Sequence, residues 1–158
     1  RQMVCESEMG DGPPVRVWRT SHTGGHRFAP TLIDMPDGRY WAGVEADLAG
    51  EILRPEGPVA AIASHYRGWA ALETCAEQNA EAAAFMRVGW DWLACEKQVE
   101  TVGHDPALDL HTVRFDYRPD GKEARSFEVT VEFTGTVPTM NCMKEGSKGE
   151  NSQYRVIA

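Results

Sequence analysis

The chain has 158 residues, which is enough for one domain or for a compact core with an appended subdomain. Its 42% apolar and 25% charged residues are typical of a globular protein, and its formal net charge of −8 argues against nucleic-acid binding, which normally needs a basic surface. No apolar run approaches the roughly 20 residues of a membrane-spanning helix, and the first residues lack the apolar stretch of a signal peptide, so a cytoplasmic protein without membrane contact is expected.

Short strands and loops are predicted for the first third of the chain. Alternating apolar and charged residues indicate a strand at 15–20, between a polar, turn-rich loop at 6–14 and a second loop that contains two glycines. A hairpin is predicted for 31–44, because an Asp-Gly pair stands between two β-prone runs. Residues 46–53 indicate a short helix.

A helical region followed by strands is predicted for the remainder. Residues 69–97 carry helix-forming side chains at helical spacing, which indicates one long helix, or two helices with a break at Gly89. Alternation predicts strands at 111–117 and 126–133 and a final edge strand at 154–157. This order of elements points to an α+β or mixed α/β fold.

The four cysteines are widely scattered and form no CxxC motif, which excludes a zinc ribbon and a dithiol redox motif. They are Cys5, Cys75, Cys95 and Cys142. Because no signal peptide is recognised, free thiols in a reducing cytoplasm are expected rather than disulfides. Cys75 and Cys95 are expected to pack as small apolar residues in the helical region.

A pair of histidines, His22 and His26, stands out in the loop SHTGGHRFAP. The two glycines between them disfavour a helix interior and let the backbone approach a bulky ligand closely. Two imidazoles on such a loop can bind one metal ion, although zinc would need two further ligands. The HExxH signature of metalloproteases is absent, since no Glu stands between the histidines. His65, His104 and His111 are expected to be structural or exposed rather than ligands.

The residues around this pair carry a family resemblance. The run VWRTSHTGGHRFAP at 17–30, followed by Leu32, the PDG at 36–38 and the WAG at 41–43, closely resembles the sucrase/ferredoxin-like family of thioredoxin-like ferredoxins. Weaker similarities follow downstream, and they lie at residues 65–68, 77–81, 141–142 and 154–156. The resemblance spans most of the chain.

The resemblance implies a two-iron two-sulfur (2Fe–2S) cluster. In family members that carry a cluster, both histidines of the motif bind one iron, so His22 and His26 are expected as its ligands here. Two cysteines of an earlier segment bind the other iron. Neutral imidazoles in place of thiolates raise the reduction potential and couple reduction to protonation. The implied function is electron transfer, with a reductase or an electron acceptor as the redox partner, for which an acidic surface is suited.

This chain departs from the family pattern because the cysteine-rich segment is missing. Cys5 is the only cysteine upstream of the histidines, and residues 6–14 are too few and too rich in Gly and Pro for a helix. Three interpretations remain: the chain is the C-terminal part of a longer protein and lacks the first strand, the first helix and the cysteine ligands; Cys5 is one ligand and its partner lies just upstream of Arg1; or the cluster is lost and the scaffold is kept. The first two are favoured together, so the first strand and helix of a thioredoxin-like fold are expected to be lacking. Cys5 is the candidate third ligand, and Cys142 is a further candidate if the tail folds back. Residues 1–100 are expected to form the thioredoxin-like region, and 101–158 a β-rich extension packed on it.

Three other functions stay open. The protein could be a cluster-free binding or assembly subunit that keeps the scaffold, or it could hold mononuclear zinc through His22, His26 and a cysteine. A hydrolase is disfavoured, because the carboxylates form no glycosidase signature. A homo-oligomer, or a place in a larger complex, also stays open.

Overall fold

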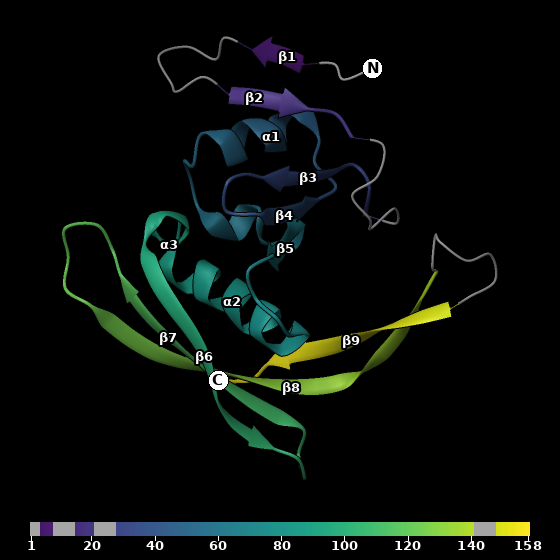
Figure 1. Ribbon diagram of the computed structural model, residues 1–158, viewed down its shortest axis with the longest axis vertical. Coiled ribbons are helices and arrows are strands. Elements are labelled where there is room, and N and C mark those ends of the chain that lie inside the picture. Colours follow the sequence, from purple (N-terminus) through teal and green to yellow (C-terminus); the bar gives the residue numbers. More distant parts are fainter. Residues whose placement is uncertain (1–3, 8–14, 21–27, 141–147) are drawn as a thin grey trace.

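The computed structural model describes residues 4–7, 15–20, 28–140 and 148–158 (Figure 1). The described part of the chain is α+β, as predicted, and each of its strand pairings is antiparallel. Its strands form sheets of two, three and four strands. The thioredoxin-like arrangement and the absence of a first strand and helix are not confirmed. No helix in the described ranges is long and apolar enough to cross a membrane.

The two-stranded sheet pairs β1 (Val4–Ser7) with β2 (Val15–Trp18). The predicted strand at 15–20 is confirmed in its first four residues. The start of the predicted loop is wrong, because Glu6 and Ser7 belong to β1. This strand carries no alternation of its own and depends on pairing with β2, which a local pattern does not reveal.

The three-stranded sheet has the order β3 (Thr31–Asp34), β4 (Arg39–Ala42) and β5 (Tyr66–Trp69). The predicted hairpin is confirmed, and Gly38 has the positive φ of +75° that its turn requires. The predicted helix is confirmed with the same bounds as α1 (Ala46–Leu53). Two short 3₁₀ turns, η2 (Val59–Ala61) and η3 (Ala63–His65), then lead into β5.

The helical region contains two helices, α2 (Cys75–Val88) and α3 (Asp91–Ala94), so the predicted break at Gly89 is confirmed. Thr74 begins α2 through a capping box, in which its hydroxyl accepts from the Glu77 amide while the Glu77 carboxylate accepts from the Thr74 amide. The helical region begins later than predicted, at Cys75, because Trp69 belongs to β5, and it ends earlier, at Ala94.

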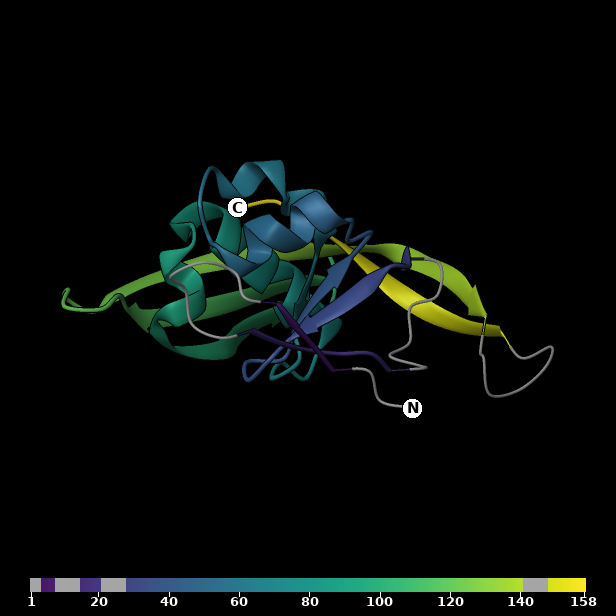
Figure 2. The same ribbon diagram turned by 90° about the horizontal axis from the view of Figure 1, so that it is seen from above.

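The four-stranded sheet is a meander of β6 (Glu96–Asp105), β7 (Leu110–Arg118), β8 (Arg125–Met140) and β9 (Lys148–Val156). The predicted strands in this part are confirmed, although β8 and β9 are longer than expected. Strand β6 was not predicted. The boundary proposed at residue 100 lies inside β6, and the division into two regions stays a prediction. In Figures 1 and 2, β8 and β9 extend well beyond the helices as a two-stranded arm.

Helix α2 lies on the concave face of the four-stranded sheet and also contacts β5 (Figure 1). Its small residues Ala76, Ala80 and Ala84 are buried and let the helix approach its neighbours closely. Trp92 of α3 packs edge-on against Phe115 of β7 at 5.5 Å between ring centroids. One hydrophobic core therefore joins the helices to both larger sheets.

Candidate functional site

The described part of the chain contains one of the predicted ligands, Cys5. Cys5 lies in β1, where its backbone is paired with Val17. His22 and His26 lie outside the described residues, and so does Cys142. His22 follows Val17 by five positions in the sequence. The pairing of β1 with β2 thus brings the backbone of Cys5 to the strand that leads into the histidine loop.

The far end of this loop is fixed to the three-stranded sheet. The Phe28 carbonyl accepts a hydrogen bond from the Gly43 amide at 2.8 Å, and the Pro30 carbonyl accepts one from the Val44 amide at 3.0 Å. Gly43 has a φ of +61°, a backbone conformation that favours glycine. The WAG motif therefore holds the residues that follow the histidines.

An aromatic cavity of about 500 Å³ adjoins Phe28. The Arg67 guanidinium lies 4.6 Å above the Phe28 ring. The remaining lining residues lie on β3, β4, β5 and α2 or directly after β5. Most are aromatic or small: Thr31, Tyr40, Trp41, Ala42, Gly68, Trp69, Ala70 and Gln78. Such a lining suits an apolar or planar group next to the loop.

A buried ionic network joins the three-stranded sheet to the helices. The Glu81 carboxylate accepts from Arg39 Nη1 at 2.5 Å, from the Tyr66 hydroxyl at 2.9 Å and from the Trp92 indole at 2.8 Å. Burial alone would lower the pKa of Arg39, but Tyr66 and Glu81 raise it above its ordinary value. Burial, and then the charge of Glu81, raise the pKa of Tyr66. The network holds β4 and β5 against α2 and α3, and sequence reasoning did not find it.

The two cysteines with described side chains differ in exposure. Cys95 is buried, as predicted, whereas the prediction for Cys75 is wrong, because this thiol is exposed at the first position of α2. Lys97 donates to the Trp92 carbonyl at 2.7 Å and to the Cys95 carbonyl at 2.8 Å. Burial raises the pKa of the Cys95 thiol and lowers the pKa of the Lys97 ammonium.

The remaining histidines fall into two groups. His65 donates from Nδ1 to the Ala42 carbonyl at 2.8 Å, which is the structural role expected for it. His104 and His111 lie side by side on the hairpin of β6 and β7, together with Asp109. Sequence reasoning did not bring this group together, because it missed β6.

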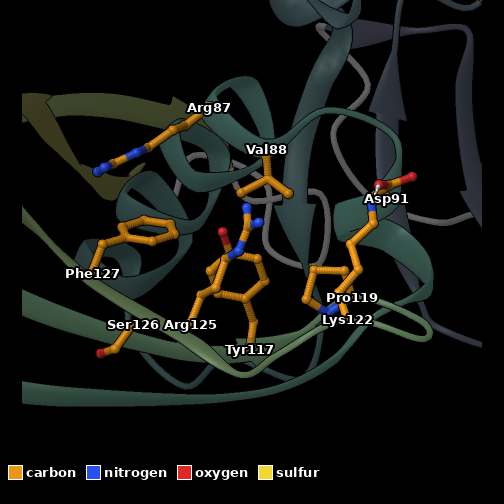
Figure 3. A pocket seen from close by; sticks show the side chains of 9 residues that line it. All are labelled: Arg87, Val88, Asp91, Tyr117, Pro119, Lys122, Arg125, Ser126 and Phe127. Atoms are coloured by element: carbon orange, nitrogen blue, oxygen red, sulfur yellow. Dashed lines mark hydrogen bonds and ion pairs between the residues drawn. The ribbon is translucent and has the colours of Figure 1, made fainter.

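A second cavity, of about 560 Å³, lies at the other end of α2 (Figure 3). Arg87, Lys122 and Arg125 give it a cationic lining. On one side of the cavity, the Arg87 guanidinium lies 4.4 Å from the centre of the Phe127 ring. On the other side, the Lys122 ammonium pairs with the Asp91 carboxylate at 3.1 Å. Its charge suits an anionic group, and no predicted ligand lines it.

Comparison with protein families identifies the first part of the chain. Residues 2–68 match the sucrase/ferredoxin-like family. The predicted family is therefore confirmed for this part of the chain, a little under half of its length. Comparisons with curated proteins and with solved structures give no significant match.

The sucrase/ferredoxin-like segment contains Cys5, His22 and His26 and the strands from β1 to β4, and it ends within β5. It contributes Arg39 and Tyr66 to the buried network, and α2 and α3 contribute the other two members. The weaker similarities at 77–81, 141–142 and 154–156 lie beyond it.

Proposed function

We propose that this protein is an electron-transfer protein that holds a 2Fe–2S cluster, with His22 and His26 as the ligands of one iron. The observation that carries the proposal is that the sucrase/ferredoxin-like match includes both histidines and the residues that hold their loop. A thioredoxin-like fold for this segment is part of the proposal.

The donor set in this chain suits such a cluster. Two neutral imidazoles serve one iron, and thiolates serve the other, as in Rieske centres. Cys5 is the first thiolate, because β1 places its backbone beside the strand that leads to His22. Cys142 is the candidate for the second thiolate, and the buried thiol of Cys95 is not one. A bound cluster would supply one-electron chemistry at a potential raised by the imidazoles.

The surface beside the loop suits a protein partner. Val17 and Trp18 are 46% and 57% exposed, and they lie a few positions before His22 in the sequence. Exposed apolar side chains next to a functional segment are typical of docking surfaces. We propose that a reductase or an electron acceptor docks here, and that the protein has no hydrolase activity of its own.

The proposal is tested on anaerobically purified protein by its iron and sulfide content and by its visible absorption before and after reduction with dithionite. Red-brown protein with two irons and two sulfides per chain is expected. His22→Ala and His26→Ala are expected to lose the cluster, and His104→Ala serves as the matched histidine control. Colourless, iron-free protein would support the cluster-free subunit, and stoichiometric zinc lost in His22→Ala would support the mononuclear site.

The cysteine ligands are tested in the same way. Cys5→Ser and Cys142→Ser are expected to lose most of the iron, whereas Cys75→Ser, which removes an exposed thiol on α2, should retain it. His22→Cys tests the charge argument, because an added thiolate should lower the reduction potential by on the order of 100 mV. Sucrose hydrolysis by the purified protein would contradict the assignment as a non-enzyme.

A further inference from the structure

The register of the β6–β7 hairpin brings two histidines together. His104 and His111 are direct partners across the two antiparallel strands, and their side chains lie on the same face of the sheet. Their rings stack at 4.3 Å between centroids, with 19° between the ring planes. This hairpin extends at the bottom of Figure 1, away from the β1–β2 sheet.

Asp109 is held next to both histidines by the turn of the hairpin. Its φ of +51° makes it the only described residue other than glycine with a positive φ. Its carbonyl accepts a hydrogen bond from the Phe133 amide of β8 at 3.0 Å, which fixes the turn to the neighbouring strand. A non-glycine residue in this conformation is uncommon, and such residues cluster at binding sites.

The distances from Asp109 to the two histidines suit a shared metal ion better than hydrogen bonds. Asp109 Oδ1 lies 3.7 Å from His104 Nε2 and 3.6 Å from His111 Nε2, and both separations exceed the range of an N–H···O hydrogen bond. Two ligands bound to one tetrahedral zinc at about 2.1 Å stand about 3.4 Å apart. A shift of a few tenths of an ångström would bring each His–Asp pair to that spacing.

We propose that His104, Asp109 and His111 bind a divalent transition-metal ion, with zinc the best match, at a site separate from the His22/His26 loop. Two imidazoles and one carboxylate are donors that zinc accepts, and no thiolate is required. The side chains of His104 and Asp109 are about half exposed, and that of His111 is 21% exposed. Solvent can therefore reach the ion and supply the remaining ligand. Tyr154 packs edge-on against His111 at 5.6 Å and limits how that ring can turn.

The test uses the full chain carrying His22→Ala and His26→Ala, so that the loop histidines cannot contribute and the result does not depend on the proposed cluster. Isothermal titration with ZnCl₂ is expected to show one bound Zn²⁺ per chain. Loss of a residue that only supports a metal ligand weakens binding by up to ~100-fold. His104 and His111 are proposed as direct ligands, so adding His104→Ala or His111→Ala should weaken zinc binding by at least that factor. Asp109→Asn keeps the size of the side chain and should weaken binding as well.

Asp116→Asn is the matched control, because Asp116 is an exposed carboxylate on the same hairpin, outside the group, and its loss should leave the affinity unchanged. In NMR spectra, the imidazole nitrogens of His104 and His111 should shift when Zn²⁺ is added, and circular dichroism should show that each variant is folded. Absence of zinc binding in the background variant would overturn the proposal. An affinity unchanged by His104→Ala and His111→Ala would overturn it too.

Discussion

Glu81→Gln is expected to destabilise the protein by about 3–5 kcal/mol, the loss typical of breaking a buried ion pair. Glu81 is fully buried, and Arg39 is 1% exposed. The carboxylate accepts hydrogen bonds from Arg39, Tyr66 and Trp92, whereas the NH₂ group of Gln cannot accept any. With the NH₂ group in place of Oε1, the contacts to Arg39 and Trp92 are lost, and at roughly 1.5–3 kcal/mol each they sum to about 3–6 kcal/mol, which overlaps this range.

The loss of stability is large because Glu81→Gln leaves the buried charge of Arg39 without its carboxylate partner. Arg39 Nε and Nη2 have no hydrogen bond within the described part of the chain, so Glu81 is the main compensation for the buried guanidinium. The double variant Arg39→Met/Glu81→Gln is therefore expected to be more stable than Glu81→Gln alone, because no uncompensated charge remains in the core.

Urea denaturation followed by tryptophan fluorescence measures the change, since Trp92 itself belongs to the network. Glu128→Gln is the matched control. Glu128 pairs with Arg114 at 2.9 Å on the sheet surface, where both side chains are more than 40% exposed, and its loss should change stability by less than about 1 kcal/mol. If Glu81→Gln behaves like this control, or if the double variant is the less stable one, the reasoning is refuted.

Three further predictions follow from single features of the fold. Thr74→Ala removes the hydroxyl that caps α2 and should lower the free energy of unfolding by about 1 kcal/mol in urea; no change would mean that Glu77 caps the helix alone. With the other two cysteines replaced by Ser, iodoacetamide should modify Cys75 quickly and Cys95 only on unfolding, because burial raises the pKa of the Cys95 thiol; equal rates on mass spectrometry would contradict this. Burial also raises the pKa of Asp34. Its contribution to the free energy of unfolding is therefore fully present below the unfolded-state pKa of about 3.9 and is lost as the pH rises through the folded-state pKa. Asp34→Asn should therefore stabilise the protein at neutral pH by less than about 1 kcal/mol, with no gain below roughly pH 3.9. A variant less stable than the original protein at neutral pH would contradict a raised pKa for Asp34.

Elements with strong local signals could be predicted from the sequence. The hairpin of β3 and β4 has its Asp-Gly turn, and the break between α2 and α3 has Gly89. Strand β6 was missed because its first residues resemble the helical composition before it and its side chains are mostly exposed. Strand β1 was missed because a four-residue segment depends on its partner.

The candidate sites also differ in whether a local sequence motif reveals them. His22 and His26 could be found because they stand in one contiguous motif, and the family match includes them. Arg39 and Glu81 are 42 positions apart in the sequence, and no local sequence pattern indicates that they pair. His104 and His111 meet only through the register of two strands, one of which was not predicted.

The central claim is that His22 and His26 bind one iron of a 2Fe–2S cluster, and hyperfine spectroscopy of the reduced protein tests it most directly. Protein labelled with ¹⁵N-histidine should show two strongly coupled histidine nitrogens in its paramagnetic resonance spectrum, and His22→Cys should retain one of them. A reduced cluster without any histidine nitrogen coupling, or no paramagnetic cluster at all in anaerobically prepared protein, would contradict the claim.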